Sequence, residues 1–584
     1  MAVADKWIYK NGVLLYTVDH NLRILDLHSS ATTELVVDQT KLLSGIKENY
    51  TAKAIFDLLY FANDIISCLY THARPYRRSW LLVFNARENR IITIQRLETA
   101  YKIFVRNNDR FLFFGTYSHN GRDGFQRWVL KAYDLQREVW NDRSLLLGPP
   151  IGSDIGSTVW FEILDGYFYG VANLVTIEDE VERSAYYVAF RFPTDQSWYQ
   201  NLEWVPQEEM WRRQHIEGTM DDRWAILNIF KDEATGKLRI LESRKEWLYR
   251  RRTAQRTYYM TDLTFCGTID KGKGTDHGEQ SNTHTSFEDS DDEDGSEDGE
   301  VFDGVVAYPD RSRRSRQPNS GEGFVPPARD PHSVHRGDDG EASVMFTLSK
   351  CFNRSYHPSC HTFMDLVDDC LPPSSKQQIR IRAGSRRLLS PSELANPSQS
   401  YSAQDEEDPY KYEEVLLWPP EQDPESFDSN LALLIRILNP PSHRGGIRAA
   451  SDDRSVVYST GGTGGGCAAL IFLSFDAGIC LEGISPYLGK MPLARPAGKC
   501  MKGSTLGTPP DGWGSVLQPE LQQCDTTLAA GQELDNPEPQ VPSGHTSERL
   551  SRIEPAMYRY IGHGYHFFSD PSSTATADPT DSSG

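Results

Sequence analysis

Short apolar runs separated by turn residues recur through the first part of the chain. The runs are rich in Val, Ile, Leu, Tyr, Phe and Trp, and the breaks carry Asn, Asp, Gly and Arg. VLLYTV and LRILDL, joined by Asp19, His20 and Asn21, form a pattern typical of a β-hairpin. The same pattern predicts six hairpins, at residues 12–27, 79–97, 111–140, 166–192, 224–247 and 454–481.

These hairpins follow one another without an amphipathic helix between them, which disfavours βαβ units and favours antiparallel meanders. One short sheet cannot bury both of its faces, and blades arranged around an axis solve this while protecting the sheet edges. The sequence therefore predicts an all-β protein, a β-propeller of roughly six to eight antiparallel blades. Tandem β-sandwich domains are the alternative architecture.

Changes in composition divide the chain. Residues 271–342 are poor in aliphatic side chains and carry SFEDSDDEDGSEDGE followed by RSRRSR, which predicts a disordered acidic and basic insertion. Residues 489–584 are rich in Pro, Gly, Ser and Thr and predict a mostly disordered tail. The full division is residues 1–270 as the first part of the propeller, 271–342 as the insertion, 343–488 as the second part with a loop insertion at 372–412, and 489–584 as the tail with a candidate closing strand at 556–568.

Net charge indicates which partners to expect, and cysteine content indicates which cellular compartment to expect. The 584 residues include 61 Lys and Arg against 82 Asp and Glu, a net charge of −21, which argues against nucleic acid or an anionic membrane as the main partner. No apolar run approaches the ~18 residues of a membrane helix, and no secretion signal is recognisable. Nine cysteines without a CxxC pair fit a reducing compartment, so we expect an intracellular protein, cytoplasmic or nuclear.

Two clusters of residues contain side chains of types that bind metal ions. Cys351, His357, Cys360, His361 and Cys370 have ligand types that suit zinc, but no knuckle spacing joins them. The acidic run at 288–300 resembles a calcium loop only superficially, because Ser290 and Val301 fall on positions that require acidic ligands. We therefore expect no metal and no cofactor. Ser290 and Ser296 in this run are candidate phosphorylation sites, and a solvated acidic spacer is the alternative interpretation.

Polar motifs give little indication of catalysis. Arg212 and Arg213 in MWRRQH are candidate partner contacts, or they pair with Asp221, Asp222 or Glu242 between blades. GGTGGG at 461–466 is followed by an apolar run better suited to a strand than to a helix, which favours a hairpin turn over a dinucleotide site. No nucleophile elbow, HExxH or paired-carboxylate motif is present, so no catalytic residue is assigned and we expect a protein that is not an enzyme.

Five stretches of the chain are specific enough to compare with known families: SCLYTHARPYRRSWLLVFNAR (67–87), GSDIGSTVWFEILDGYFYGVAN (152–173), EEMWRRQHIEGTMDDRWAILNIFKDEATGKLRILESRKEW (208–247), YHPSCHTFMDLVDD (356–369) and RSVVYSTG (454–461). Together they resemble a family of fungal (ascomycete) F-box proteins with a propeller-like body. The resemblance covers most of residues 1–485. It implies a substrate-recognition body of an SCF-type ubiquitin ligase, with a protein as partner.

The chain departs from this family at its beginning. The family usually starts with an F-box, the helical module that binds the Skp adaptor, but Trp7 already lies in the first β-like segment. Skp and cullin are therefore expected as partners only if another docking element exists. A stand-alone scaffold or a decoy without ligase docking is the alternative, and a hydrolase or lyase with a site in the propeller channel is the third hypothesis.

Overall fold

The fold is that of a computed structural model. The structure describes residues 2–4, 6–44, 46, 55–72, 78–120, 125–148, 151–173, 184–195, 201–206, 209–214, 218–220, 225–233, 235–248, 254–265, 334–337, 350–369, 378–392, 410–413, 415–420, 429–440, 446–461, 468–483, 485–486, 550–561 and 565–566.

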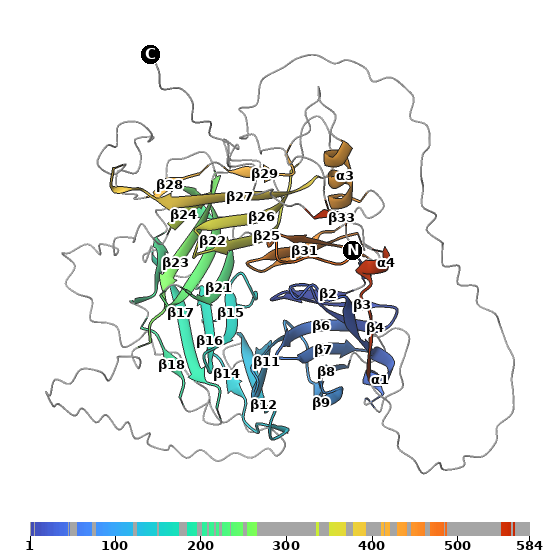
Figure 1. Cartoon of the computed structure of the whole chain (residues 1–584). Helices are drawn as coiled ribbons and strands as arrows, with labels where there is room; N and C mark the ends of the chain where they lie inside the picture. The colour runs from blue at the N-terminus through green and yellow to red at the C-terminus, as the bar shows by residue number, and fades with distance from the viewer. Residues whose placement is uncertain are drawn as a thin grey trace, which may run out of the picture. The chain divides into compact units, whose positions relative to one another are not determined.

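The described residues form a seven-bladed β-propeller, in which seven antiparallel sheets follow one another around a ring (Figure 1). Strands are given from the axis outward. The first blade has β2 (Trp7–Lys10), β3 (Val13–Val18), β4 (Asn21–Asp26) and β5 (Thr33–Asp38); the second has β6 (Ile55–Ala62), β7 (Ile65–Thr71), β8 (Ser79–Asn85) and β9 (Arg90–Leu97); the third has β10 (Phe104–Asn107), β11 (Phe111–Asn120), β12 (Gln126–Asp134) and the outer pieces β13 (Val139–Trp140) and β14 (Leu145–Leu146); and the fourth has β15 (Val159–Leu164), β16 (Tyr167–Asn173), β17 (Ser184–Pro193) and the outer pieces β18 (Glu203–Trp204) and β19 (Trp211–Gln214). The fifth blade has the inner pieces β20 (Gly218–Met220) and β21 (Ile226–Lys231), then β22 (Leu238–Leu248), β23 (Ala254–Asp262) and β24 (Val334–Gly337); the sixth has β25 (Lys350–His357), β26 (Thr362–Asp368), β27 (Ile379–Leu388) and the outer pieces β28 (Tyr410–Tyr412) and β29 (Leu416–Trp418); and the seventh has β30 (Arg448–Ser451), β31 (Ser455–Gly461), β32 (Ala468–Ser474) and β1 (Ala2–Ala4).

Three helices and three further strands complete the described elements. They are α1 (Gln39–Leu43), α3 (Ser429–Leu438), α4 (Tyr558–Ile561), β33 (Ser485–Pro486), β34 (Ser551–Pro555) and β35 (Tyr565–His566).

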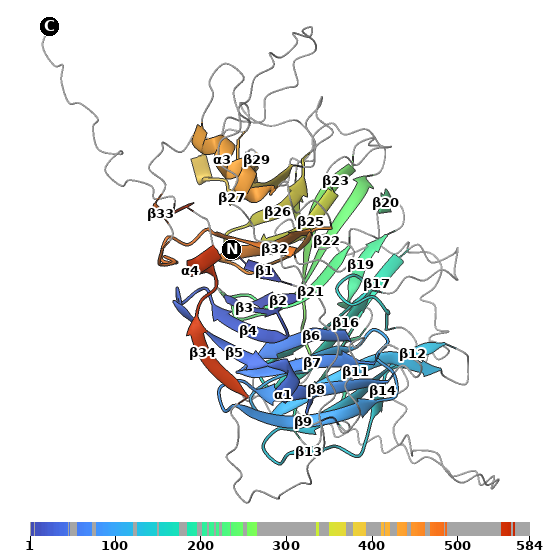
Figure 2. The same ribbon diagram turned by 90° about the vertical axis from the view of Figure 1, so that its right-hand side faces the viewer.

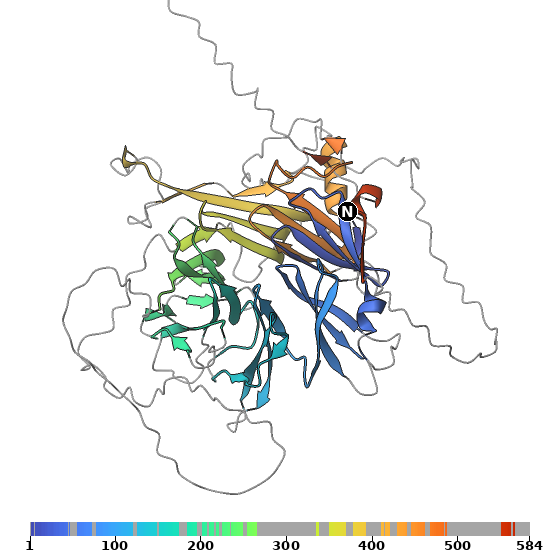
Figure 3. The same cartoon turned by 60° about the horizontal axis from the view of Figure 1, so that its bottom comes forward.

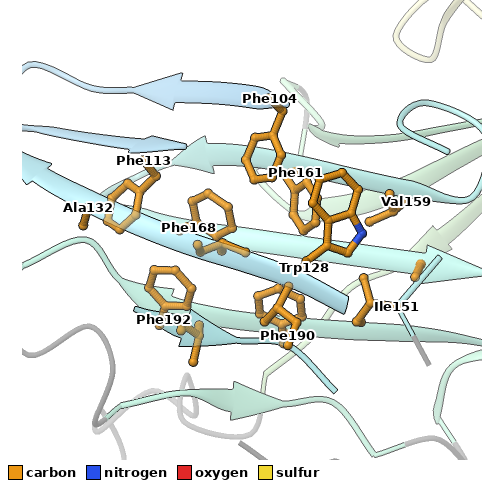
Figure 4. Packing of buried hydrophobic residues seen from close by; sticks show 14 of the residues in the cluster. Phe104, Phe113, Trp128, Ala132, Ile151, Val159, Phe161, Phe168, Phe190 and Phe192 are labelled. Atoms are coloured by element: carbon orange, nitrogen blue, oxygen red, sulfur yellow. The ribbon is translucent and has the colours of Figure 1, made fainter. Parts of the chain in front are cut away.

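Neighbouring blades are held together by apolar contact. Seven buried clusters lie in the described part of the chain, and each joins two consecutive blades. The cluster between the third and fourth blades is the most aromatic; Phe104 and Phe161 stack there with ring centroids 4.3 Å apart (Figure 4). Burying both faces of every blade in this way provides the main stabilisation of a propeller.

All six hairpins that the sequence predicts are confirmed, as the pairs β3–β4, β8–β9, β11–β12, β16–β17, β21–β22 and β31–β32. The first shows why the turn residues matter. Only Asp19 and His20 separate β3 from β4, and both have positive φ, 47° and 59°. Such a two-residue turn matches the twist of the strands, and Asp is among the residues that tolerate this conformation best. Likewise, β31 and β32 pair antiparallel on either side of residues 462–467, which lie outside the described residues.

The predicted closing strand at 556–568 is wrong. The last blade is completed by the N-terminal strand β1, whose residues pair antiparallel with β32 (Figure 2). Ala556 and Tyr558 are buried between the first and last blades, but the segment forms α4, and β35 pairs with β33 instead. Just before it, β34 adds a fifth strand to the first blade beside β5. The aromatic island is therefore explained by burial of side chains against the ring rather than by strand pairing.

Two predicted insertions are also corrected. Residues 372–412 include β27, the third strand of the sixth blade. Its arginines gave the segment a polar composition, yet Arg380 is almost fully buried, donates to the Pro419 carbonyl at 2.8 Å and pairs with Asp369. Similarly, the predicted insertion at 271–342 extends too far, because β24 pairs with β23 as the outer strand of the fifth blade. The acidic run itself lies outside the described residues.

The two faces of the ring differ in which connections they carry. The first strands of neighbouring blades lie side by side and surround the axis. We call the face where these inner strands begin the entry face, and the opposite one the exit face. Because successive strands alternate in direction, the loops between second and third strands lie on the entry face, and the turns after the inner strands lie on the exit face. Figure 3 shows the ring from a third direction, with the N-terminus beside the last blade.

Candidate functional site

Four polar side chains from four consecutive inner strands meet near the propeller axis. Lys10 of β2 donates a hydrogen bond to the hydroxyl of Tyr60 on β6, and that hydroxyl lies 3.5 Å from Oε1 of Glu162 on β15. Tyr60 and Glu162 belong to the second and fourth blades, which share no interface. Side chains of blades that do not touch can meet only where the inner strands converge. We call Lys10, Tyr60, Arg106 and Glu162 the axial cluster.

Arg106 of β10 is the most firmly held member of the axial cluster. Its Nε donates to the Phe161 carbonyl and its Nη1 to the Val105 carbonyl, both at 2.8 Å. The guanidinium lies 4.9 Å from the ring centroid of Tyr60 and 5.5 Å from that of Trp160. Two backbone bonds and two aromatic faces therefore fix this cation, and its nearest carboxylate, Glu162, remains 3.7 Å away.

Burial and charge act on the titrating groups of this cluster. Burial lowers the pKa of Lys10; the Glu162 carboxylate opposes the shift, and the nearby Arg106 cation adds to it. Burial and the Glu162 carboxylate both raise the pKa of Tyr60, so its phenol is neutral and serves as a hydrogen-bonding group. With Lys10 protonated, the cluster holds two cations and one carboxylate.

The cluster lies toward the exit face, because Lys10 ends β2 and Glu162 stands in the second half of β15. A second set of charges lies toward the entry face. Lys6 pairs with Asp57 of β6 at 2.8 Å, and Arg448 of β30 lies 5.2 Å from the ring of Trp7. Burial lowers the pKa of Arg448, and the Asp57 carboxylate opposes this shift. Here too, two cations face one carboxylate.

A Ser–His–Asp cluster lies where the last and first blades meet. Ser455 Oγ is 3.0 Å from His28 Nε2 and donates to Asp452 Oδ1 at 3.0 Å, and the Tyr9 hydroxyl bonds to the same serine. In a catalytic triad the carboxylate binds the imidazole nitrogen remote from the serine. In this protein Asp452 lies 3.3 Å from the same Nε2, and Arg454 faces Nδ1 at 3.3 Å. With Ser455 fully buried, the arrangement is that of a contact between blades.

The two arginines of the MWRRQH motif are buried rather than displayed. Arg212 is 5% exposed, and its Nε donates to both carboxylate oxygens of Glu242 at 3.1 Å. Arg244 donates to the same carboxylate at 2.6 and 2.8 Å, and Tyr187 donates to it at 2.6 Å. The structure thus favours the interpretation that Arg212 pairs with Glu242 between blades. Arg213 is 9% exposed, so neither guanidinium presents an open surface.

The remaining candidates are not assembled into a site. Ser290, Ser296 and Cys370 lie outside the described residues. Cys351 donates to the Asn353 carbonyl, and burial raises the pKa of its thiol to about 12. Within the described ranges, no group of three or more His, Cys, Asp and Glu side chains is placed to hold a metal ion.

Exposed apolar side chains gather at the entry face of the second to fourth blades. Ile55 begins β6, Tyr101 precedes β10, Phe125 lies between β11 and β12, and Ile155 precedes β15. The Lys102 ammonium, next to Tyr101, donates to Asp154 at 2.5 Å and to Ser153 at 3.0 Å, which ties the third blade to the fourth at this point. We call Ile55, Tyr101, Phe125 and Ile155 the entry-face patch.

Comparison with known proteins assigns the chain to no family. No protein-family model matches the chain, and no curated protein matches it. Among solved structures, the WD40 domain of SCAP from fission yeast is similar over 80% of this chain and 83% of its own, with 7% identity and a TM-score of 0.31. The xylan β-1,4-xylosidase from Bacillus halodurans C-125 is similar over 45% of this chain, with 11% identity and a TM-score of 0.22.

The chain spans about half the length of that xylosidase, 53%. The phage phi92 endosialidase gives 13% identity over 59% of this chain and 53% of its own, with a TM-score of 0.22. Likenesses this weak carry no argument about activity, and the resemblance to F-box proteins stays a prediction. None of the helices that the structure describes is long and apolar enough to cross a membrane.

Proposed function

We propose that this chain is a non-catalytic protein-interaction module whose propeller recognises a protein substrate, in the manner of the body of an SCF-type F-box protein. The observation that carries the proposal is the entry-face patch. Its four side chains come from three consecutive blades, and each is more than a third exposed, from 37% for Ile155 to 62% for Phe125. Exposed aromatic and aliphatic side chains on a rigid support are typical anchors of protein interfaces.

The geometry of the polar clusters supports binding over catalysis. Ser455 and Glu242 sit in arrangements whose composition suggests chemistry, yet both are buried contacts between blades. The entry-face patch, in contrast, is accessible and lies on a face built from loops. The expected occupant is a protein segment with apolar side chains, because the patch offers apolar area and the neighbouring Lys102 ammonium is already paired with Asp154.

Affinity purification of the full chain and two variants from fungal cells tests this proposal. The variant Tyr101→Ser/Phe125→Ser removes the two aromatic anchors of the entry-face patch. The control Val139→Ser/Phe475→Ser removes two side chains of similar exposure, 52% and 51%, that lie at the exit ends of their blades. We expect proteins recovered with the wild type and the control to be lost from the first variant. Equal recovery from all three would contradict the assigned surface.

The same purification separates the two forms of the proposal. Recovery of the Skp adaptor and a cullin supports a ligase substrate receptor. Recovery of patch-dependent partners without them supports the second candidate, a stand-alone scaffold or decoy.

A further inference from the structure

The axial cluster contains more hydrogen-bond donors than acceptors. Lys10 has three N–H groups, of which the described residues engage one, through the Tyr60 hydroxyl. Arg106 uses Nε and one Nη1 proton on backbone carbonyls, and Nη2 has no hydrogen-bond partner among the residues that the structure describes. Among the described residues, the carboxylate beside them is Glu162, which lies 3.7 Å from the Arg106 Nε. It receives one long hydrogen bond from Tyr60 and accepts from its neighbour, the Ile163 amide, at 3.2 Å.

A third unused donor, the indole N–H of Trp160, lies near Arg106. The indole ring of Trp160 is 5.5 Å from the Arg106 guanidinium, and its Nε1 is buried without a hydrogen-bond partner in the described part of the chain. A buried N–H group left unpaired is destabilising, and such groups are rare in native structures. The unused donors of Lys10 and Arg106, with the indole N–H near the arginine, indicate a ligand that accepts hydrogen bonds.

The charge of the cluster specifies the sign of that ligand. Lys10 and Arg106 outweigh Glu162, so the axis is locally positive in a chain whose net charge is −21. The lysine comes from the first blade and the arginine from the third, on either side of the Tyr60 strand, so a ligand at the axis reaches both. Charge-assisted bonds to an oxyanion are stronger than bonds between neutral groups, and Arg and Lys are the residues that usually make them.

We propose that the exit end of the propeller axis is a binding site for an oxyanion group, a carboxylate or a phosphate, held by Lys10 and Arg106. Tyr60 fixes the position of the lysine, and Glu162 acts as an internal competitor for the two cations. The site is separate from the entry-face patch, and it is independent of whether the patch binds a protein. The oxyanion belongs either to a small free anion or to an acidic side chain of a partner.

Isothermal titration of the full chain tests the site, at constant ionic strength set with sodium chloride. Three probes are used: inorganic phosphate, citrate, and the capped acidic tripeptide acetyl-Asp-Asp-Glu-amide. Saturable binding of phosphate or citrate alone identifies a small free anion as the ligand. Binding of the tripeptide identifies a partner's acidic side chain. Absence of saturable binding for all three probes would overturn the proposal.

Three variants assign the binding to the axial cluster. Lys10→Met is expected to weaken binding about tenfold or more, because it removes a charged donor, whereas Lys10→Arg keeps the charge and retains binding. Glu162→Gln is expected to tighten binding several-fold, since it removes the competing carboxylate. Lys102→Met, at the entry face, is the matched control and leaves the dissociation constant unchanged. Equal affinity in Lys10→Met and wild type, or no gain in Glu162→Gln, would exclude the assigned residues.

Discussion

Arg212 and Glu242 join the fourth and fifth blades through a buried ion pair. The arginine stands on β19 and the carboxylate on β22, and the Arg212 Nε is 3.1 Å from both carboxylate oxygens. Burial alone would raise the pKa of Glu242, but Arg212 and Arg244 together lower it well below its usual value. One carboxylate is thus shared as an ion-pair partner by two buried guanidinium groups, and its removal breaks both ion pairs.

Substituting Glu242→Gln should therefore destabilise the propeller by about 3–5 kcal/mol, the usual cost of breaking a buried ion pair by removing one partner. Urea unfolding at pH 7 measures this. The control Glu203→Gln removes a carboxylate that is 2.8 Å from Arg191 but 41% exposed, and should cost less than about 1 kcal/mol. Equal losses of unfolding free energy in the two variants would show that the buried Glu242 pair stabilises the fold no more than the exposed Glu203 pair does.

The pH dependence of the same pair follows from the sign of the shift. A carboxyl with a lowered pKa in the folded state contributes stability that is present above its unfolded pKa of about 4.5 and lost as the pH falls below it. The stability difference between wild type and Glu242→Gln should therefore shrink as the pH is lowered from 6 to 3, by up to about 1.4 kcal/mol per pH unit below 4.5. A difference that stays constant over this range would contradict the assigned ionisation.

The Ser455–His28–Asp452 cluster has the residue types of a catalytic triad but not its geometry, so we expect the serine not to react as a nucleophile. A fluorophosphonate probe should leave Ser455 unlabelled, since the serine is fully buried and Asp452 does not orient the imidazole from Nδ1. Ser455→Ala should lower stability by about 1–3 kcal/mol, because Asp452 and Tyr9 lose a buried partner. The control Ser459→Ala removes a single 3.5 Å bond and should change little. Labelling of Ser455 would indicate a hydrolase instead.

Closure of the ring by β1 can be tested by deletion. Removing residues 2–5 takes away the strand paired with β32 and uncovers the outer edge of the last blade, together with the buried Ala4. We expect the melting temperature to fall by at least about 5 °C, since several ladder bonds and an apolar contact are lost. A truncation that removes residues 567–584 is the control. Unchanged melting of the first variant would mean that β1 does not hold the ring closed.

The fold was largely predictable from local alternation, because each predicted hairpin has long apolar strands with characteristic turns. The inner strands were harder to recognise. WIYK, FVRN and RAAS are short and partly polar, as strands near the axis are, so the number of blades did not follow from the pattern. Strand β27 of the sixth blade was missed for a related reason: Arg380 is buried and paired, but the polar composition of the segment suggested a loop.

The axial cluster was not predictable from the sequence. Lys10, Tyr60, Arg106 and Glu162 are single residues about fifty positions apart, and only the repeat of the blades brings them together. The available signal was a charged residue inside a short inner strand, such as Arg106 in FVRN. Net charge pointed the other way, because an overall −21 says nothing about a local excess of cations.

Three glycines in the described strands lie directly opposite phenylalanine rings. Gly170 on β16 pairs directly with Phe190 on β17, and a Cβ at Gly170 would lie 2.3 Å from the phenyl ring (Figure 4 shows Phe190 in its cluster). Gly115 with Phe104 and Gly384 with Phe363 repeat this arrangement in two other blades. In each case the missing side chain leaves room for a ring to lie over the neighbouring strand.

Gly170→Ala should therefore cost about 1–3 kcal/mol through overpacking, measured by urea unfolding. The double variant Gly170→Ala/Phe190→Ala should lose less than the sum of its single changes, because the new methyl group enters space that the ring has left. Combining Gly170→Ala with Val171→Ala is the control. Val171 belongs to the cluster on the opposite face of the blade, so the two losses should add. Additive losses in the Phe190 double variant as well would show that the ring does not occupy the space above Gly170.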